Sequence, residues 1–180
     1  ALTGVANRRQ FDEVLEAEWR RARRARSPLA LAFVDVDHFK AYNDGYGHVA
    51  GDACLQQVAA LMAYLLAGTS ARLARYGGEE FAVILPGADV PAAAAIAERL
   101  RAAVETRAFE HRHAGSGLVT VSLGVASSSP GLPIDSESLV AEADRALYAA
   151  KHAGRNRVRL ATVELASAPR SASSRTPSIG

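Results

Sequence analysis

Cysteine and net charge are both scarce in this chain, and each scarcity excludes a class of protein. The single cysteine, Cys54, excludes an intrachain disulfide framework and cannot build a zinc site alone. A reducing compartment is therefore expected, with Cys54 as a core residue of an apolar helix. A net charge of +2 over 180 residues is too small to make nucleic acid or an acidic membrane the expected partner.

Long apolar runs are missing as well. No run reaches the ~18 residues that cross a bilayer, and no signal peptide opens the chain. We therefore expect a cytoplasmic location, with a membrane anchor elsewhere in the full-length protein as an open alternative. The chain starts without methionine, so we expect it to be a piece of something longer.

The composition that is present is ordinary for a globular protein, with 49% apolar and 22% charged residues. We predict one domain over residues 1–162. Residues 163–180 are rich in Ser and Pro and have little to bury, which predicts a disordered tail or linker.

Hydrophobic periodicity predicts an α+β fold. Helices are expected over 7–26, 55–65, 91–107 and 136–153, strands over 29–37, 118–127 and 157–162, a β-hairpin over 72–86 and a loop over 38–52. The core order strand, helix, strand, strand, helix, strand predicts a ferredoxin-like antiparallel sheet with helices packed on one face, flanked by further elements.

Acidic residues stand at two points that this fold brings together. Asp35 and Asp37 end the first strand, and Glu79 and Glu80 follow Gly77-Gly78 at the hairpin tip. The glycines are expected to supply the positive φ of a tight turn. Clustered carboxylates repel one another unless a cation lies between them, and oxygen ligands favour Mg²⁺ or Mn²⁺. The alternative is a set of ordinary acids at strand ends.

Basic and Asx residues also have two interpretations each. Lys151 and Arg155 are four apart at a helix end and are expected to share a face, either to bind phosphate or to complement the helix dipole. Asn43 and Asp52 are either turn formers and caps or readers of guanine, whose adjacent N–H donors a carboxylate can accept.

Five ordered blocks resemble one family. RYGGEEF (75–81), LTGVANRRQFD (2–12), FVDVDHFKAYNDGYGHVAGD (33–52), VTVSLGVA (119–126) and ADRALYAAKHAGRNRV (143–158) are similar to the motifs of GGDEF domains, the bacterial diguanylate cyclases, in the GGEEF form. The resemblance covers residues 1 to about 160 and implies a nucleotidyl cyclase or polymerase-palm-like fold.

The resemblance implies that two GTP molecules are condensed into cyclic di-GMP with release of two pyrophosphates. Each domain would bind one GTP, and a two-fold homodimer would be required, because the 3′-hydroxyl on one side attacks the α-phosphate on the other. A sensor or receiver region is expected before the domain. The alternative is a catalytically silent module that binds GTP or cyclic di-GMP.

The resemblance also implies a role for each matching residue. Asp35, Glu79 and the backbone carbonyl of Val36 would hold Mg²⁺ or Mn²⁺, and Glu79 or Glu80 would help deprotonate the attacking hydroxyl. The other matching positions would bind substrate: Gly77 and Gly78 allow close approach of phosphates, Asn43 and Asp52 contact guanine, and Lys40, Lys151, Arg155 and Phe39 line the phosphate pocket.

One family motif is missing. Many members have an RxxD pair before the signature that binds product and inhibits the enzyme. Gly68 and Ala71 occupy those positions here, so we expect no product inhibition through that site.

Overall fold

A computed structural model describes residues 2–129 and 135–161, so the predicted tail over 163–180 lies outside the described residues. The elements follow in the order α1 (Arg8–Ala25), β1 (Leu29–Val36), α2 (Phe39–Tyr46), α3 (His48–Leu66), β2 (Arg72–Arg75), β3 (Glu80–Pro86), α4 (Val90–Thr106), β4 (Val121–Ser128), α5 (Ser136–His152) and β5 (Val158–Leu160).

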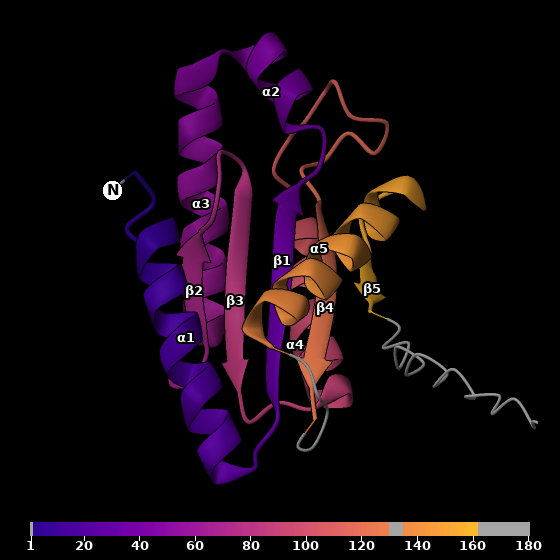
Figure 1. Ribbon diagram of the computed structural model, residues 1–180. Helices are drawn as coiled ribbons and strands as arrows, with labels where there is room; N and C mark the ends of the chain where they lie inside the picture. The colour runs from indigo at the N-terminus through magenta and orange to yellow at the C-terminus, as the bar shows by residue number, and fades with distance from the viewer. Residues whose placement is uncertain (1, 130–134, 162–180) are drawn as a thin grey trace, which may run out of the picture.

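The strands form one sheet in the order β2-β3-β1-β4-β5 (Figure 1). All neighbouring pairs are antiparallel except β4 and β5, which are parallel. The four strands β2, β3, β1 and β4 have the order of a ferredoxin-like sheet, so the predicted α+β class and core order are confirmed.

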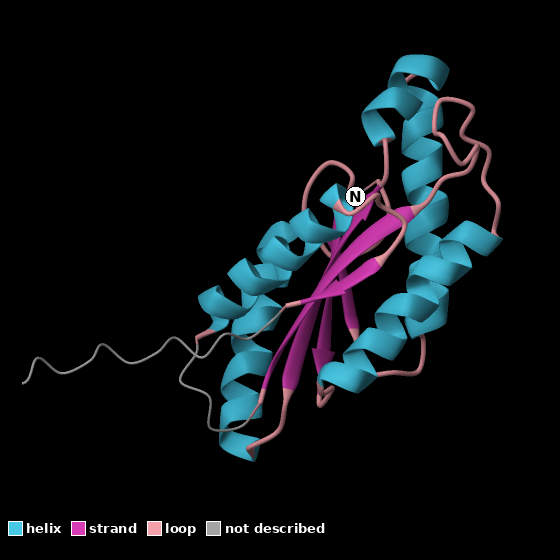
Figure 2. Ribbon diagram, turned by 90° about the vertical axis from the view of Figure 1, so that its right-hand side faces the viewer, coloured by secondary structure: helices cyan, strands magenta, loops and turns pink. Residues whose placement is uncertain are grey.

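Helices cover both faces of this sheet, as the nearly edge-on view in Figure 2 shows. Alternate residues of β1 explain why: Ala30, Ala32 and Val34 pack toward α3 and α4, while Leu31 and Phe33 pack toward α1 and α5. The expectation of helices on one face holds for α3 and α4 only. The helices added before and after the core, α1 and α5, cover the other face because β1 is apolar on both sides.

The segment predicted as a loop over 38–52 is instead helical. It contains α2 and the start of α3, which meet at Gly47 with φ of 84°. Its glycine and Asx residues are typical of turns, but burial of Phe39, which is 7% exposed, outweighs that local preference. The glycine at the junction lets the chain change direction without a break in helical structure longer than one residue.

The helix α3 buries one face in the domain, and much of its other surface is exposed. It is long and apolar enough to cross a membrane by length and composition alone, yet seven of its residues are buried in the fold. Cys54 is among them at 3% exposure, as predicted, and burial raises the pKa of its thiol to about 11. The buried apolar residues of α3 are part of the protein core.

The N-terminal ends of three helices, α1, α4 and α5, follow the expected capping chemistry. Asn7 caps α1 in a reciprocal capping box with Gln10, and Pro91 lies in the first turn of α4 after the N-cap Asp89. The cap of α5 is Asp135, one residue before the expected Ser136. These caps fix where each helix begins relative to the sheet.

The backbones of a helix and the sheet approach each other closely at Gly124 of β4. A Cβ atom at this position would lie 2.0 Å from the backbone nitrogen of Leu147 and 2.3 Å from the carbonyl oxygen of Ala143, both in α5. Backbone atoms cannot rotate away as side-chain atoms do. Gly124 is therefore the residue that lets α5 lie against the sheet.

We expect Gly124→Ala to lower the free energy of unfolding by about 1–3 kcal/mol, because α5 must move away from β4. Urea denaturation followed by circular dichroism measures this. Gly115→Ala is the matched control, since a Cβ there meets no atom within 4 Å. Equal stability of the two variants would contradict the packing role of Gly124.

Candidate active site

The predicted site residues gather at the end of the sheet where β1 terminates. Figure 1 shows that the β2–β3 turn, α2, the start of α3 and the C-terminal end of α5 all lie at this end. Segments far apart in the sequence thus meet around the last residues of β1.

Acidic side chains converge here as the sequence predicted. Asp35 lies directly opposite Glu80 in the antiparallel β1–β3 pair, so both side chains are on one face of the sheet. One more hydrogen bond continues the contact beyond this pair. The Val36 N–H donates at 3.3 Å to the carbonyl oxygen of Glu79, which lies just before β3. The catalytic and metal-binding roles of these residues stay predictions.

The turn that carries Glu79 does not use its glycines as predicted. Neither Gly77 nor Gly78 has a positive φ. Hydrogen bonds hold the turn instead: the N–H groups of Tyr76 and Gly77 donate to the Glu80 carbonyl, and the Arg75 guanidinium donates to the Gly78 carbonyl at 2.6 and 3.0 Å. The turn is longer than a two-residue hairpin turn, so it does not require left-handed residues.

The glycines matter for space rather than for conformation. A Cβ at Gly77 would lie 2.7 Å from the Glu80 carboxylate, whereas a Cβ at Gly78 would meet no atom within 4 Å. Gly77 therefore leaves room for the Glu80 carboxylate, and Gly78 leaves an open approach to the backbone of the turn. The second feature is compatible with a ligand that approaches the turn closely.

Lys151 enters this acidic group from the last turn of α5. Its ammonium nitrogen donates to a carboxylate oxygen of Asp35 at 2.6 Å, and the Asp35 side chain is only 8% exposed. Burial raises the pKa of Asp35 to about 6; Lys151 opposes this shift, and the charges of Glu79 and Glu80 add to it. Asp35 is thus a desolvated carboxyl that needs a cationic neighbour to stay ionised.

The donor atoms fit a hard divalent cation. Among the described residues, no three His, Cys, Asp or Glu side chains are grouped so that they hold a metal ion by themselves. Two carboxylates and a backbone carbonyl, at Asp35, Glu79 and Val36, offer only oxygen, which suits Mg²⁺ or Mn²⁺ sharing its remaining positions with water and phosphate. A cation bound to Asp35 would replace the positive charge that Lys151 now supplies.

The second half of the site is the corner between α2 and α3. Asn43 of α2 packs against Gly51 of α3 so closely that a Cβ at Gly51 would lie 1.8 Å from Asn43 Oδ1. That oxygen is buried and has no hydrogen-bond partner among the described residues. Asp52, the next residue after Gly51, is exposed near the start of α3. The corner therefore holds an unsatisfied amide beside an exposed carboxylate.

Aromatic residues that the sequence analysis did not select support this corner. Tyr42 stacks on Phe39 with ring planes 8° apart, and it contacts the edge of His111 at 5.1 Å between ring centroids. His111 is 1% exposed, and its Nε2–H donates to the carbonyl of His38 at 3.2 Å. His111 lies in the connection between α4 and β4, so no periodic pattern could have indicated its contact with α2.

The basic residues are arranged differently from the prediction of one shared helix face. Lys40 is exposed in the first turn of α2, and Lys151 is in α5. Arg155 lies beyond the end of α5, after Gly154 with φ of 109°, and has a left-handed backbone with φ of 61°. Because the helix stops between them, Lys151 and Arg155 do not share a helix face.

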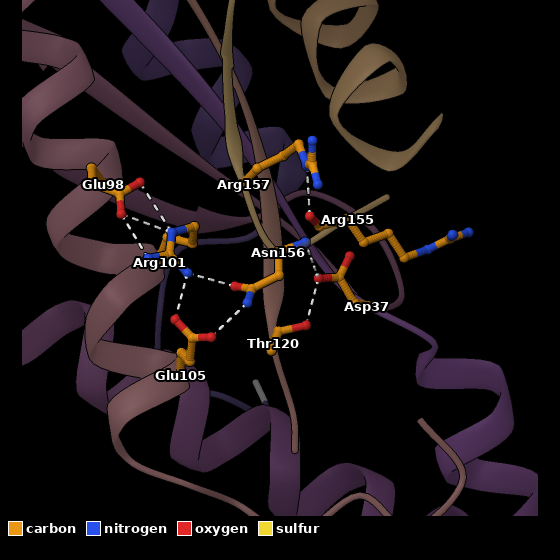
Figure 3. Close-up of polar contacts among 8 residues, drawn as sticks. All are labelled: Asp37, Glu98, Arg101, Glu105, Thr120, Arg155, Asn156 and Arg157. Carbon is orange, nitrogen blue, oxygen red and sulfur yellow. Dashed lines mark hydrogen bonds and ion pairs between the residues drawn. The ribbon is translucent and has the colours of Figure 1, made fainter. Parts of the chain in front are cut away.

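Asp37 follows Asp35 by two residues, but its carboxylate is engaged in hydrogen bonds within the protein. Its carboxylate accepts hydrogen bonds from the hydroxyl groups of Thr120 and Ser122 at 2.7 Å and from the backbone N–H of Asn156 at 3.0 Å. Figure 3 shows how Asn156 continues this network to Arg101 and Glu105 of α4. Asp37 is therefore a structural carboxylate, and Asn156 is a residue that sequence reasoning missed.

Comparison with known proteins places this geometry in a family. The family model described as "Diguanylate cyclase, GGDEF domain" matches residues 1–157. The chain is 40% identical over 161 residues to diguanylate cyclase DgcP of Pseudomonas aeruginosa, which covers 89% of this chain and 23% of that protein. An uncharacterised protein of Bacillus subtilis, YhcK, is 42% identical over 160 residues, or 87% of this chain and 44% of that protein.

Solved structures agree in fold. The GGDEF domain of DgcB from Caulobacter crescentus, in complex with cyclic di-GMP, has a TM-score of 0.81 at 39% identity and covers 89% of this chain and 94% of its own. The active GGEEF domain of a Vibrio cholerae diguanylate cyclase has a TM-score of 0.77 at 33% identity, with 89% and 99% covered. The chain spans less than half the length of DgcP and YhcK.

Burial lowers the pKa of His111, which gives a pH-dependence to stability. The pKa of His111 in the folded state lies below the ordinary value near 6.5, so the unfolded state binds a proton first as pH falls. The unfolding free energy is therefore highest above pH 6.5 and decreases as pH falls through the folded-state pKa. We expect the unfolding free energy of wild type to fall relative to that of His111→Gln between about pH 7 and pH 5.

Urea denaturation at several pH values measures the difference between the two proteins. Protonation of Asp35, whose pKa is raised, changes the unfolding free energy in the same pH range and in the opposite direction. Both proteins contain Asp35, so this effect cancels in the difference between them. His152→Gln, at an exposed histidine of α5, is the control variant. A constant difference between wild type and His111→Gln would contradict the effect of burial.

Proposed function

Since the chain belongs to the GGDEF family, we propose that it is a diguanylate cyclase domain, a nucleotidyltransferase that condenses two GTP molecules into cyclic di-GMP and two pyrophosphates. The acidic edge at the end of β1 is the main support for this proposal. Asp35 faces Glu80 across adjacent strands while the Val36 N–H bonds the Glu79 carbonyl, so the strand end and the signature turn form one acidic edge. This edge combines oxygen ligands with an open approach beside Gly78.

A divalent cation, Mg²⁺ or Mn²⁺, would be held by Asp35, Glu79 and the carbonyl of Val36. When bound, such an ion lowers the pKa of a coordinated hydroxyl and stabilises charge on the phosphate and the leaving pyrophosphate. Glu79 or Glu80 accepts the proton of the attacking 3′-hydroxyl. The buried position of Asp35, 6% exposed, strengthens its interaction with a cation because water screens it little.

The other roles that the family resemblance implies are assigned to residues that surround this edge. Lys40, Lys151 and Arg155 bind the triphosphate, and Gly77 and Gly78 let it approach the turn. Asn43 and Asp52 bind guanine at the α2–α3 corner, with Phe39 lining the pocket. The buried, unpartnered Oδ1 of Asn43 supports a polar ligand there, because a buried carbonyl oxygen without a hydrogen bond costs about 1–3 kcal/mol.

Turnover requires two copies of the domain. One domain supplies the 3′-hydroxyl of its GTP, and the other supplies the α-phosphate that is attacked, so the O–P bond forms across a two-fold dimer and pyrophosphate leaves. Phosphoryl transfer of this kind depends on in-line positioning and charge neutralisation. The same proposal includes a preceding sensor or receiver region that sets the dimer geometry. It also includes a cytoplasmic location and a domain that ends at residue 162 before a linker.

The alternative is a silent module that binds GTP or cyclic di-GMP without turnover. The two hypotheses differ in one product, because only the cyclase releases pyrophosphate from GTP. The intact GGEEF sequence at 77–81 favours the cyclase. Protein should be assayed with Mg²⁺ over a range of concentrations, since the rate per monomer rises with concentration while the dimer forms.

We expect Glu79→Ala to lower the initial rate of pyrophosphate release by about 100-fold or more, because it removes a cation ligand and a proton acceptor. Glu13→Ala changes an exposed glutamate of α1 and should have the wild-type rate. Circular dichroism checks that both variants are folded. Equal turnover by Glu79→Ala and wild type would remove Glu79 from the mechanism, and binding of GTP without any turnover would favour the silent module.

Product should not act as a high-affinity inhibitor at the position of the missing RxxD pair. Gly68, with φ of 77°, follows α3, and Ala71 precedes β2, so neither offers the charged side chains of that motif. We expect initial rates to be unchanged by micromolar cyclic di-GMP. Non-competitive inhibition would show that another surface binds the product.

A further inference from the structure

Two consecutive residues after α5 have a left-handed backbone, Arg155 with φ of 61° and Asn156 with φ of 46°. Asn tolerates this conformation better than most residues with a Cβ atom, whereas Arg does not favour it. A turn of this kind persists only where surrounding groups hold it in place. The described contacts of the turn identify those groups.

The backbone of the turn is held by Asp37. The Asn156 N–H donates to Asp37 Oδ2, which Thr120 also bonds, while Ser122 bonds the other oxygen. Asp37 is 2% exposed. Three donors on a buried carboxylate leave it little freedom to move, so the turn is anchored to a fixed point two residues after Asp35.

The side chain of Asn156 is held by α4. Its Oδ1 accepts a hydrogen bond from Arg101 Nη1 at 2.6 Å, and its Nδ2 donates to Glu105 Oε1 at 2.7 Å. Arg101 itself bonds Glu98 and Glu105, each at 2.7 Å, and its side chain is 14% exposed. Both polar ends of the Asn156 amide are therefore engaged.

The guanidinium of Arg155 takes no part in this network. In the part of the chain that is described, no hydrogen bond or ion pair uses it. The backbone of Arg155 is engaged instead: its N–H donates to the Ala150 carbonyl at 3.1 Å, and its carbonyl accepts from Arg157 Nε at 2.8 Å. Figure 3 shows the Arg155 side chain extended away from Arg101 and Glu105. The network thus fixes the backbone of Arg155 and leaves its cationic end available.

We infer that Asp37, Arg101, Glu105 and Asn156 are positioning residues, which hold the turn so that Arg155 is presented to the triphosphate of the bound nucleotide. The inference rests on the proposed function, because it takes Arg155 as a phosphate contact. Arg101 touches none of the predicted site residues, so its effect on nucleotide binding is transmitted through Asn156 and the turn. Its contribution then disappears when the Arg155 guanidinium is removed.

A double-mutant cycle tests this transmission. The probe is 3′-deoxy-GTP with Mg²⁺, which has no attacking hydroxyl, so turnover does not enter the measurement. Calorimetric titration of the 180-residue chain gives Kd. We expect Arg155→Ala to weaken binding about tenfold, the loss of one charge-assisted contact. Arg101→Met should weaken binding severalfold in wild type and cause no further loss in Arg155→Ala.

Two further variants separate positioning from general loss of stability. Asn156→Gly adopts the left-handed backbone without strain but lacks the contacts to Arg101 and Glu105, so it should fold and still bind severalfold more weakly. Arg145→Met removes an exposed arginine whose ion-pair partner, Glu142, is in the same helix α5, and it should bind as wild type does. Thermal unfolding confirms that each variant is folded at the titration temperature.

The outcomes are distinguishable. Wild-type affinity in both Arg101→Met and Asn156→Gly would overturn the inference and leave the proposed function standing. The inference would also be overturned if the fold-changes in Kd caused by Arg101→Met and Arg155→Ala multiplied in the double variant, because the two residues would then act separately. If wild type did not bind 3′-deoxy-GTP at all, the proposed function would fail and the inference with it.

Discussion

The fold and the candidate site both depend on the burial of β1 between two layers of helices. All eight residues of this central strand are buried, and it is hydrogen-bonded on both edges, to β3 and to β4. An acid at the end of such a strand loses water and must find partners among nearby donors or cations. The antiparallel register fixes those neighbours, because it sets Asp35 opposite Glu80 and Ser122.

Two carboxylates at the end of β1 meet this requirement in different ways. Asp37 is fully hydrogen-bonded by Thr120, Ser122 and Asn156, so it belongs to the framework. Among the described residues, the Asp35 carboxylate is paired only with the ammonium of Lys151. Burial, together with the charges of Glu79 and Glu80, raises its pKa to about 6. The carboxylate with incomplete compensation is the one that a cation stabilises most, which is the physical basis for separating the two roles.

Close backbone approach is the second constraint. Gly124 lets α5 lie against β4, which brings Lys151 to Asp35, and Gly51 lets α2 pack on α3, which buries the amide of Asn43. Neither glycine has a positive φ. Their role is to leave out a Cβ atom where two elements touch, and a single methyl group at either position would move an element that carries a predicted site residue.

The sequence by itself determined the α+β class, the order of the core elements, the acids at the end of β1 and the signature at 77–81, because periodicity and motifs are local. It did not indicate that α1 and α5 cover the second face, that 38–52 is helical, or that Asn156 joins Asp37 to Arg101. Those features arise from contacts between residues tens of positions apart, such as Asn156 and Asp37. Only the tertiary structure decides which distant groups satisfy one another's hydrogen bonds.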